Sequence, residues 1–262
     1  SLNSKGILLF DIDGVIRDVS QSYRLALQET VYHYCNWKPP FAKIDELKSE
    51  GIWNNDWDAS QEIIRRYINK KNLSISQPKR KELVQVFSDF YFGGDPNTAS
   101  EQWKGFIKDE PLLINDDFFS ELTANKIAWG FVSGAEKPSA KFLLETRLSL
   151  KNPLLIAMGD APEKPNPKGL LTLASKLLGN SFGEENPPIA YLGDTVADVL
   201  TIQKAREEFP SQRFISFAIA PPHLHKKNQK SARMSYEKIL KNAGADEIIS
   251  STVDVINYVK EW

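Results

Sequence analysis

The chain has 262 residues, of which 41% are hydrophobic and 26% charged, and its formal net charge at pH 7 is −1. This composition is typical of a globular protein, and the length is sufficient for one large domain or for a domain with a sizeable insertion. The balanced charge gives no electrostatic reason to expect nucleic acid or an anionic membrane surface as a partner. The single cysteine, Cys35, fits a reducing compartment, and no apolar run reaches the roughly 20 residues that span a bilayer. The N-terminus also lacks the pattern of a secretory signal, so we expect a soluble cytoplasmic protein.

The first predicted element is a strand over residues 7–10, where large apolar residues follow one another without interruption. Such a run is typical of a strand that is buried on both faces of a parallel sheet. The run ends on Asp11 and Asp13, and Gly14 then permits a sharp turn because glycine adopts positive φ without steric cost. In open α/β folds, ligands bind at the carboxyl ends of the strands, so these two carboxylates are candidates for a site.

Residues 17–99 show helical patterns only, and a loop signal, Gly93-Gly94-Asp95-Pro96, closes this block. After it, predicted strands alternate with predicted helices. The strands are expected over residues 127–132, 154–157, 189–192, 214–220 and 247–249. Alternation at this spacing favours βα units and a parallel sheet. We therefore predict a Rossmann-like α/β core, residues 1–16 and 100–262, with an all-helical domain inserted at residues 17–99.

Polar groups follow several of the predicted strands. They are Asp11 with Asp13, Ser133 with Gly134, Lys164, and Asp194 with Asp198. If the strands are parallel neighbours, these groups converge on one edge of the sheet. Two carboxylates about 4 Å apart repel by about 4 kcal/mol at an effective dielectric constant of about 20, so a cation is expected among them. Mg²⁺, which takes one or two carboxylates together with phosphate oxygens, is the natural candidate, and the set suits phosphoryl transfer.

These motifs, in this order, resemble those of the haloacid dehalogenase-like hydrolase superfamily. The opening resembles its D-x-D-G-V motif, Ser133 its second motif, Lys164 its lysine, and residues 193–198 its G-D-T-x-x-D motif. The resemblance covers nearly the whole chain, because the helical insertion is similar to the mobile cap of these proteins. It implies a Mg²⁺-dependent phosphatase that acts on a small phosphomonoester metabolite through an aspartyl-phosphate.

The resemblance also implies the roles of the carboxylates. Asp11 would be the nucleophile, and Asp13 would protonate the leaving group and then activate water. The Asp11 carboxylate, the backbone carbonyl of Asp13 and Asp194 would hold the metal, and Asp198 would ligate it through water or support its ligands. The presence of Asp13 favours a phosphatase over a dehalogenase.

Lys164, Ser133 and Gly134 would hold the phosphate oxygens, with Lys168 as the alternative to Lys164. Two other activities stay open at this point. A sugar phosphomutase of the same superfamily would transfer the phosphoryl group to a second substrate hydroxyl, and a non-catalytic binding protein would retain only the fold. The oligomeric state, monomer or homodimer, also stays open.

Substrate choice is expected to lie in the helical insertion. Asn54 and Asn55 fall between predicted helices, and Arg17 follows the first motif, so each is a candidate to contact an anionic substrate, with an ordinary structural role equally open. Residues 19–24, together with the Asn-Asn-Asp-Trp segment, resemble a subgroup of capped phosphatases with relatives linked to histidine biosynthesis. That resemblance makes histidinol phosphate a candidate substrate.

Overall fold

The computed structural model describes residues 3–53 and 55–262, and the chain divides into two compact units. The core unit comprises Ser1–Asp18 and Pro111–Trp262, and the helical unit comprises Val19–Glu110. These bounds differ from the predicted ones at both junctions, because residues 17 and 18 belong to the core unit and residues 100–110 to the helical unit. Backbone pairing explains the difference. The amide of Asp18 donates a hydrogen bond to the carbonyl of Pro111, so the segment that leaves the core unit is paired with the segment that returns to it.

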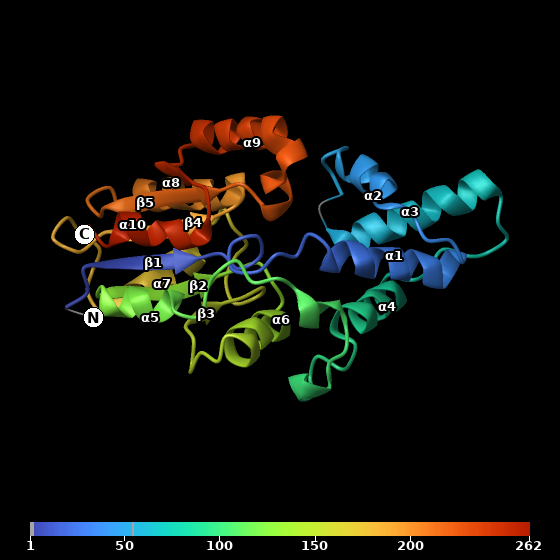
Figure 1. Cartoon of the computed structure of the whole chain (residues 1–262), viewed down its shortest axis with the longest axis horizontal. Helices are drawn as coiled ribbons and strands as arrows, with labels where there is room; N and C mark the ends of the chain where they lie inside the picture. Colours follow the sequence, from blue (N-terminus) through green and yellow to red (C-terminus); the bar gives the residue numbers. More distant parts are fainter. Residues whose placement is uncertain (1–2, 54) are drawn as a thin grey trace. The chain divides into compact units, whose positions relative to one another are not determined.

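The core unit is built on a parallel sheet, as predicted (Figure 1). Its strands are β1 (Gly6–Phe10), β2 (Ile127–Val132), β3 (Leu155–Ile156), β4 (Ile189–Gly193), β5 (Phe214–Ile219) and β6 (Glu247–Ile249). Within the described residues their order is β3-β2-β1-β4-β5-β6, and every pairing is parallel. Burial on both faces accounts for the continuous apolar runs in the sequence.

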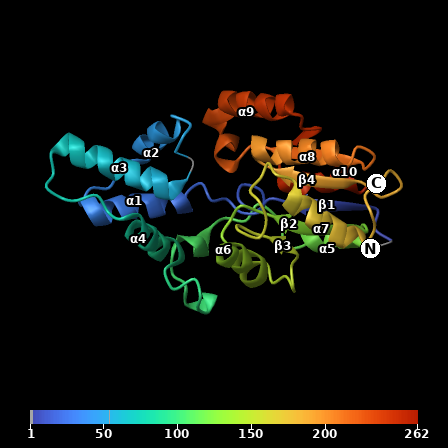
Figure 2. The ribbon, with the colours of Figure 1, turned by 180° about the vertical axis from the view of Figure 1, so that it is seen from behind.

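Helices cover both faces of this sheet, and β1 shows why. Leu8 and Phe10 point to the face packed by α5 (Phe118–Ala124) and α10 (Ile256–Val259), which lie in front in Figure 1. Ile7 and Leu9 belong to the opposite cluster, with α7 (Lys168–Leu178) and α8 (Val196–Glu208), which come forward in Figure 2. The alternation of side chains along a strand thus supplies two separate hydrophobic cores.

The strand order reverses between β1 and β4, and this reversal places the candidate site. From β1 the chain builds outward through β2 and β3, whereas β4 lies on the other side of β1 and leads outward to β5 and β6. At such a switch point, the connections leave in opposite directions and open a crevice at the carboxyl ends of the strands. Phe10 is level with both Phe131 and Leu192, so the motifs that follow these strands emerge at the same height.

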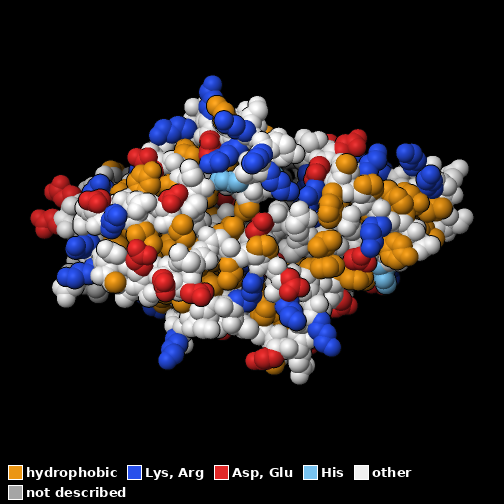
Figure 3. Space-filling view, in the orientation of Figure 1, with side chains coloured by type: hydrophobic (Ala, Val, Ile, Leu, Met, Phe, Trp, Pro, Cys, Tyr) orange, Lys and Arg blue, Asp and Glu red, His pale blue; other side chains and the backbone are white. Residues whose placement is uncertain are grey.

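The surface of the core unit has a basic region over α9 (Lys230–Ala243), visible in Figure 3 as clustered Lys and Arg side chains. Lys226, Lys227 and Lys230 are exposed there. The inner side of the same helix contributes the buried Leu240. Lys230 therefore lies on the solvated side of a packed helix, and Lys226 and Lys227 lie in the exposed segment that precedes it.

The helical unit consists, in its described part, of helices and the loops between them. The α-helices are α1 (Ser22–Cys35), α2 (Phe41–Lys48), α3 (Asp56–Lys71) and α4 (Arg80–Phe92). Its interior contains a buried carboxylate, Glu110, which accepts hydrogen bonds from the hydroxyl groups of Ser22 (2.5 Å) and Tyr91 (3.1 Å). Nowhere in the described chain is a helix both long and apolar enough to cross a membrane.

Candidate active site

A cavity of about 390 Å³ opens at the carboxyl ends of the central strands, entirely within the core unit. The predicted residues in its wall are Asp11, Asp13, Ser133, Gly134, Lys164, Asp194 and Asp198. Groups separated by more than 180 positions in sequence therefore share one space, as the strand pattern predicted.

Asp11 follows β1 directly and lies at the base of this cavity. Its Oδ1 accepts a hydrogen bond from the amide of Ile12 at 2.8 Å, and Nζ of Lys164 lies 3.4 Å from the same oxygen. Burial, followed by the negative charge of Asp198, raises the pKa of Asp11 to about 8, against an ordinary value of 3.8. A second cation at this carboxylate would favour its ionised form.

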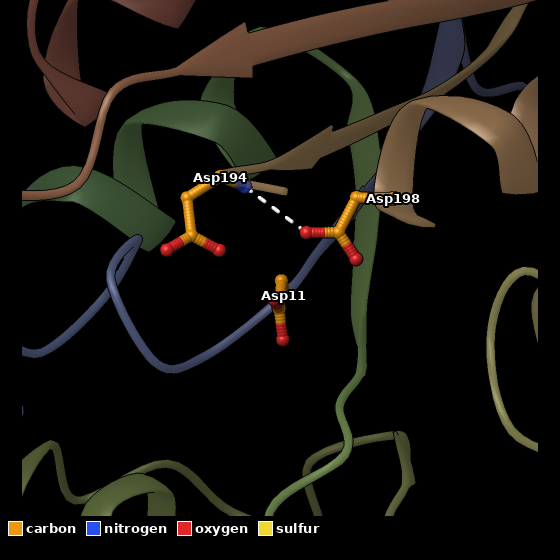
Figure 4. A group of neighbouring side chains, drawn as sticks. All are labelled: Asp11, Asp194 and Asp198. Carbon is orange, nitrogen blue, oxygen red and sulfur yellow. Dashed lines mark hydrogen bonds between the residues drawn. The ribbon is translucent and has the colours of Figure 1, made fainter. Parts of the chain in front are cut away.

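Asp198 shapes the loop that follows β4. Its Oδ2 accepts a hydrogen bond from the amide of Asp194 at 3.0 Å (Figure 4). The same oxygen accepts one from the amide of Thr195 at 3.1 Å, and the hydroxyl of Thr195 accepts one from the amide of Asp198. This reciprocal pair is a capping box at the start of α8. The Oδ1 atom of Asp198 lies 2.6 Å from Nζ of Lys164. Burial raises the pKa of Asp198, but the charge and hydrogen bond of Lys164 outweigh it, so the pKa is lowered overall.

The carboxylates of Asp11, Asp194 and Asp198 form the acidic cluster of the cavity, with oxygen atoms within 4.8 Å of one another. Burial, and then the charge of Asp11, raise the pKa of Asp194 well above its usual range. Both oxygens of Asp198 already accept hydrogen bonds, so Asp11 and Asp194 are the side chains best able to contact a cation directly. An all-oxygen donor set of crowded carboxylates fits a hard divalent ion such as Mg²⁺.

Lys164 is oriented by three partners at once. Its Nζ donates to Asp198 and, at 2.8 Å, to the hydroxyl of Tyr191, and it faces Asp11. Burial lowers the pKa of Lys164, but Asp11 and Asp198 outweigh this effect and raise it overall. Lys168, the alternative in the sequence, is exposed and is not among the described residues of the cavity wall, whereas Lys164 is.

Two tyrosines support the site, and the sequence patterns did not predict either. Tyr191 lies in β4, and its hydroxyl donates to the carbonyl of Val132 at 2.5 Å while accepting from Lys164. Tyr236 in α9 donates to the backbone carbonyl of Asp194 at 2.5 Å. A phenol in the middle of the apolar strand 189–192 is the signal that could have indicated Tyr191, because a buried hydroxyl requires a hydrogen-bond partner.

Ser133 and Gly134 form the wall that follows β2. The hydroxyl of Ser133 accepts a hydrogen bond from the amide of Ala135 at 3.0 Å, and the Ser133 side chain is buried. A Cβ atom on Gly134 would meet no described atom within 4 Å, so the backbone here is open to the cavity. An approaching anion could use both the hydroxyl and this exposed backbone.

Arg17 is the candidate substrate contact that follows the first motif. Its side chain is fully buried, and it is absent from the described cavity wall. Its Nε donates to Oδ1 of Asp13 at 2.8 Å. The guanidinium thus contacts Asp13 and does not line the cavity, which accords with the structural role that the sequence left equally open.

Of the two asparagines predicted to contact the substrate, the structure describes only Asn55. Asn54 lies outside the described residues. Asn55 is the N-cap of α3, where its Oδ1 accepts a hydrogen bond from the amide of Asp58 at 3.0 Å. This contact accounts for Asn55 as a capping residue, and a substrate contact by either asparagine stays a prediction.

Comparisons with known proteins agree with this geometry. A family model described as haloacid dehalogenase-like hydrolase matches residues 6–206. A curated relative from Phytophthora nicotianae, named imidazoleglycerol-phosphate dehydratase, is 29% identical over 246 residues. The match includes 93% of this chain and 50% of the relative, so the chain spans about half the relative's length.

Solved structures share the fold. One is a phosphonoacetaldehyde hydrolase-like protein from Oleispira antarctica, with a TM-score of 0.64, 19% identity, and coverage of 98% of this chain and 92% of that one. Another, described as a β-phosphoglucomutase from Thermotoga maritima, has a TM-score of 0.63, 16% identity, and coverage of 98% and 99%. A third, described as a phosphoglycolate phosphatase from Haemophilus somnus, has a TM-score of 0.64, 13% identity, and coverage of 98% and 99%. At these identities the likeness concerns the fold alone.

Proposed function

Because this chain belongs to the haloacid dehalogenase-like hydrolases, we propose that it is a Mg²⁺-dependent phosphatase that hydrolyses a small phosphomonoester through an aspartyl-phosphate. The observation that carries the proposal is the position of Asp11, whose Oδ1 lies 3.4 Å from Nζ of Lys164 and whose carboxylate lies within 4.8 Å of those of Asp194 and Asp198. A nucleophilic carboxylate needs cations beside it to approach a phosphate dianion, and Lys164 together with an ion held by the acidic cluster would supply them.

The carboxylates of Asp11 and Asp194, with the backbone carbonyl of Asp13, would hold the Mg²⁺ ion. When bound, the ion would neutralise charge on the transferring phosphoryl group and bring it close to Asp11. Asp198 would hold the Asp194 loop in shape through the two amide hydrogen bonds described above.

In the first step, a carboxylate oxygen of Asp11 forms a bond to phosphorus as the bond from phosphorus to the ester oxygen breaks. Asp13 gives its proton to the departing oxygen, so the alcohol leaves neutral. In the second step, water attacks the phosphorus of the aspartyl-phosphate, and Asp13 accepts the proton of that water. Inorganic phosphate is released, and both carboxyl groups return to their initial states.

The remaining residues bind and orient the phosphate. Lys164 would neutralise negative charge on the phosphoryl oxygens, and the hydroxyl of Ser133 and the backbone at Gly134 would donate hydrogen bonds to them. The orientation of Lys164 by Asp198 and Tyr191 supports this role, because donors fixed in advance need not reorganise during reaction.

An imidazole-bearing phosphomonoester is the substrate class that we would test first. The curated relative carries the name of a dehydratase of imidazoleglycerol phosphate, and the sequence resemblance independently indicates histidinol phosphate. The matched half of that relative need not carry the named dehydration. What the two indications share is a substrate with an imidazole ring and a phosphate group.

The test is release of inorganic phosphate from para-nitrophenyl phosphate and from a panel of metabolite phosphomonoesters that includes histidinol phosphate. We expect Mg²⁺-dependent release by the wild type, and loss of release in Asp11→Asn. Asp116→Asn, which changes an exposed aspartate of the same unit, is the matched control. Activity retained by Asp11→Asn would exclude Asp11 as the nucleophile. A wild type that releases no phosphate from any ester would instead favour a binding protein, or a mutase that needs a phosphorylated activator.

A further inference from the structure

Arg17 is a fully buried cation, and each of its three guanidinium nitrogens donates a hydrogen bond to a neighbouring residue. Its Nε donates to Oδ1 of Asp13 at 2.8 Å, its Nη1 to the carbonyl of Ser139 at 3.2 Å, and its Nη2 to the hydroxyl of Ser139 at 2.6 Å. Burial of a guanidinium is strongly unfavourable unless its charge is paired and its N–H groups are bonded. Such an arrangement in a short loop beside a cavity calls for a reason beyond packing.

The backbone around Arg17 is held as tightly as its side chain. The carbonyl of Arg17 accepts a hydrogen bond from the amide of Gly14 at 2.9 Å, and Arg17 forms an isolated antiparallel bridge with Leu112. Ser139, at the far end of the guanidinium, is itself buried in α6 (Lys137–Lys141). Arg17 is therefore fixed between the turn after β1 and α6, with no freedom to turn into the cavity.

Asp13 both contacts Arg17 and lines the cavity. Its side chain retains 27% of its exposed surface, against 1% for Arg17, and it lines the cavity wall. The terminal torsion of an aspartate is broad, so an unrestrained carboxyl group samples many orientations. The hydrogen bond from Nε of Arg17 to Oδ1 of Asp13 restricts that freedom.

We propose that Arg17 is a positioning residue that holds the carboxyl group of Asp13 in the orientation needed for proton transfer. The inference rests on the proposed function, in which Asp13 protonates the departing oxygen. Arginine suits the task better than lysine because its planar fork can bond Asp13 and Ser139 at the same time in fixed directions. Ser139 acts one contact further away, by holding the guanidinium in place.

The choice of ester distinguishes this role from a purely structural one. A para-nitrophenolate leaves as a stable anion and needs little help from a proton, whereas a phenolate depends on protonation more strongly. Loss of folded protein lowers the rates for both esters by the same factor. Misplacement of the proton donor lowers the rate for phenyl phosphate more than for para-nitrophenyl phosphate.

The experiment measures kcat and kcat/KM for the two esters in the wild type and in Arg17→Met, Arg17→Lys, Ser139→Ala and Asp13→Asn. For Arg17→Met we expect the ratio of the para-nitrophenyl rate to the phenyl rate to rise by roughly tenfold or more, in the direction of Asp13→Asn. Arg17→Lys should restore part of the ratio, because it keeps the charge and loses the fork. Ser139→Ala should raise the ratio less than Arg17→Met.

Two further variants serve as controls. Arg206→Met removes another arginine of the core unit, which pairs with Asp246 at 2.5 Å near the surface, and should leave the ratio unchanged. The double variant Asp13→Asn with Arg17→Met should match Asp13→Asn alone, because a residue that acts through Asp13 has no effect once Asp13 is gone. It also removes the Asp13 charge that has lost its guanidinium partner, if Arg17→Met alone folds poorly. An unchanged ratio in both Arg17 variants would overturn the inference.

A crystal structure of Arg17→Lys tests the same relationship without turnover. We expect the Asp13 carboxyl group to rotate or to lose its single orientation, while Asp11 and Asp194 stay in place. An Asp13 side chain that is unmoved would overturn the inference. If the wild type hydrolyses neither ester, the proposed function fails, and the position of Asp13 in this variant still decides whether Arg17 fixes it.

Discussion

Gly14 and Asp194 approach each other so closely that a Cβ atom on Gly14 would lie 2.1 Å from Oδ2 of Asp194. Gly14 also has a φ of +82°, a conformation that is strained for residues with side chains. The turn after β1 and the loop after β4 are thus fitted to each other at a single glycine. This contact links the motif that carries the proposed nucleophile to the motif that carries a proposed metal ligand.

Replacement of Gly14 by alanine should therefore affect both stability and metal binding. The positive φ alone disfavours alanine by roughly 1–2 kcal/mol, and the new methyl group must displace Asp194. We expect a lower free energy of unfolding and weaker Mg²⁺ binding, measured by chemical denaturation and by calorimetric titration. Gly183→Ala is the control, because a Cβ there would meet no described atom within 4 Å. Wild-type Mg²⁺ affinity in Gly14→Ala would contradict this prediction.

Tyr191→Phe should reduce turnover while preserving the fold. The variant keeps the buried ring but loses the hydroxyl that accepts from Lys164 and donates to Val132. A hydrogen bond to a charged group contributes about 1.5–3 kcal/mol, which corresponds to roughly ten- to a hundredfold in rate if the effect falls on the transition state. The measurement is kcat for para-nitrophenyl phosphate. Tyr258→Phe, which lies outside the cavity wall, should show wild-type kcat.

The metal-free protein should lose stability as the pH rises from about 5 to 8. Asp11 has a pKa of about 8 when folded and an ordinary value of 3.8, so the folded state binds its proton more tightly. The contribution of Asp11 to the stability of the folded state is fully present below pH 3.8 and is lost as the pH rises through about 8. Asp194, whose pKa is also raised, acts in the same direction. Asp198 adds no slope in this window, because its pKa is lowered below the ordinary value of 3.8.

Mg²⁺ should reverse that loss. An ion bound to ionised Asp11 and Asp194 stabilises the folded state more at pH 8 than at pH 5, since it competes with protons for the same oxygens. Thermal unfolding at both pH values, with Mg²⁺ or with a chelator, measures the difference. Asp11→Asn should flatten the pH dependence of the metal-free protein. A wild-type stability in chelator that is constant across this range would refute the prediction.

Glu110 should be important for the stability of the helical unit. Glu110→Ala leaves the hydroxyl groups of Ser22 and Tyr91 without the carboxylate that they contact. Each hydroxyl loses a hydrogen bond to a charged group, which contributes about 1.5–3 kcal/mol, so we expect a lower free energy of unfolding, measured by chemical denaturation. Glu46→Ala, on the exposed surface of α2, is the control and should have little effect. A Glu110→Ala protein with the wild-type unfolding free energy would exclude this role.

The predicted strands were confirmed, and the clearest of them, β1 and β4, are buried along their whole length. A strand such as β4 reads as a continuous apolar run, and polar or turn-forming residues mark its end. The bounds of the two compact units differ from the predicted ones at both junctions. Residues 100–110 carry short helical turns, and their assignment to the helical unit depends on contacts that periodicity does not reveal.

By itself, the sequence determined the fold class and the residue types gathered at the carboxyl edge of the sheet, because both follow from local patterns: Asp11, Asp13, Ser133, Lys164 and Asp194 each directly follow or closely trail an apolar run. The tertiary structure alone decided which side chains these residues meet. Arg17 and Ser139 are 122 positions apart, and Tyr191 and Val132 are 59 apart. Contacts at such separations depend on strand order and on the direction of each side chain, so they cannot be predicted from spacing along the chain.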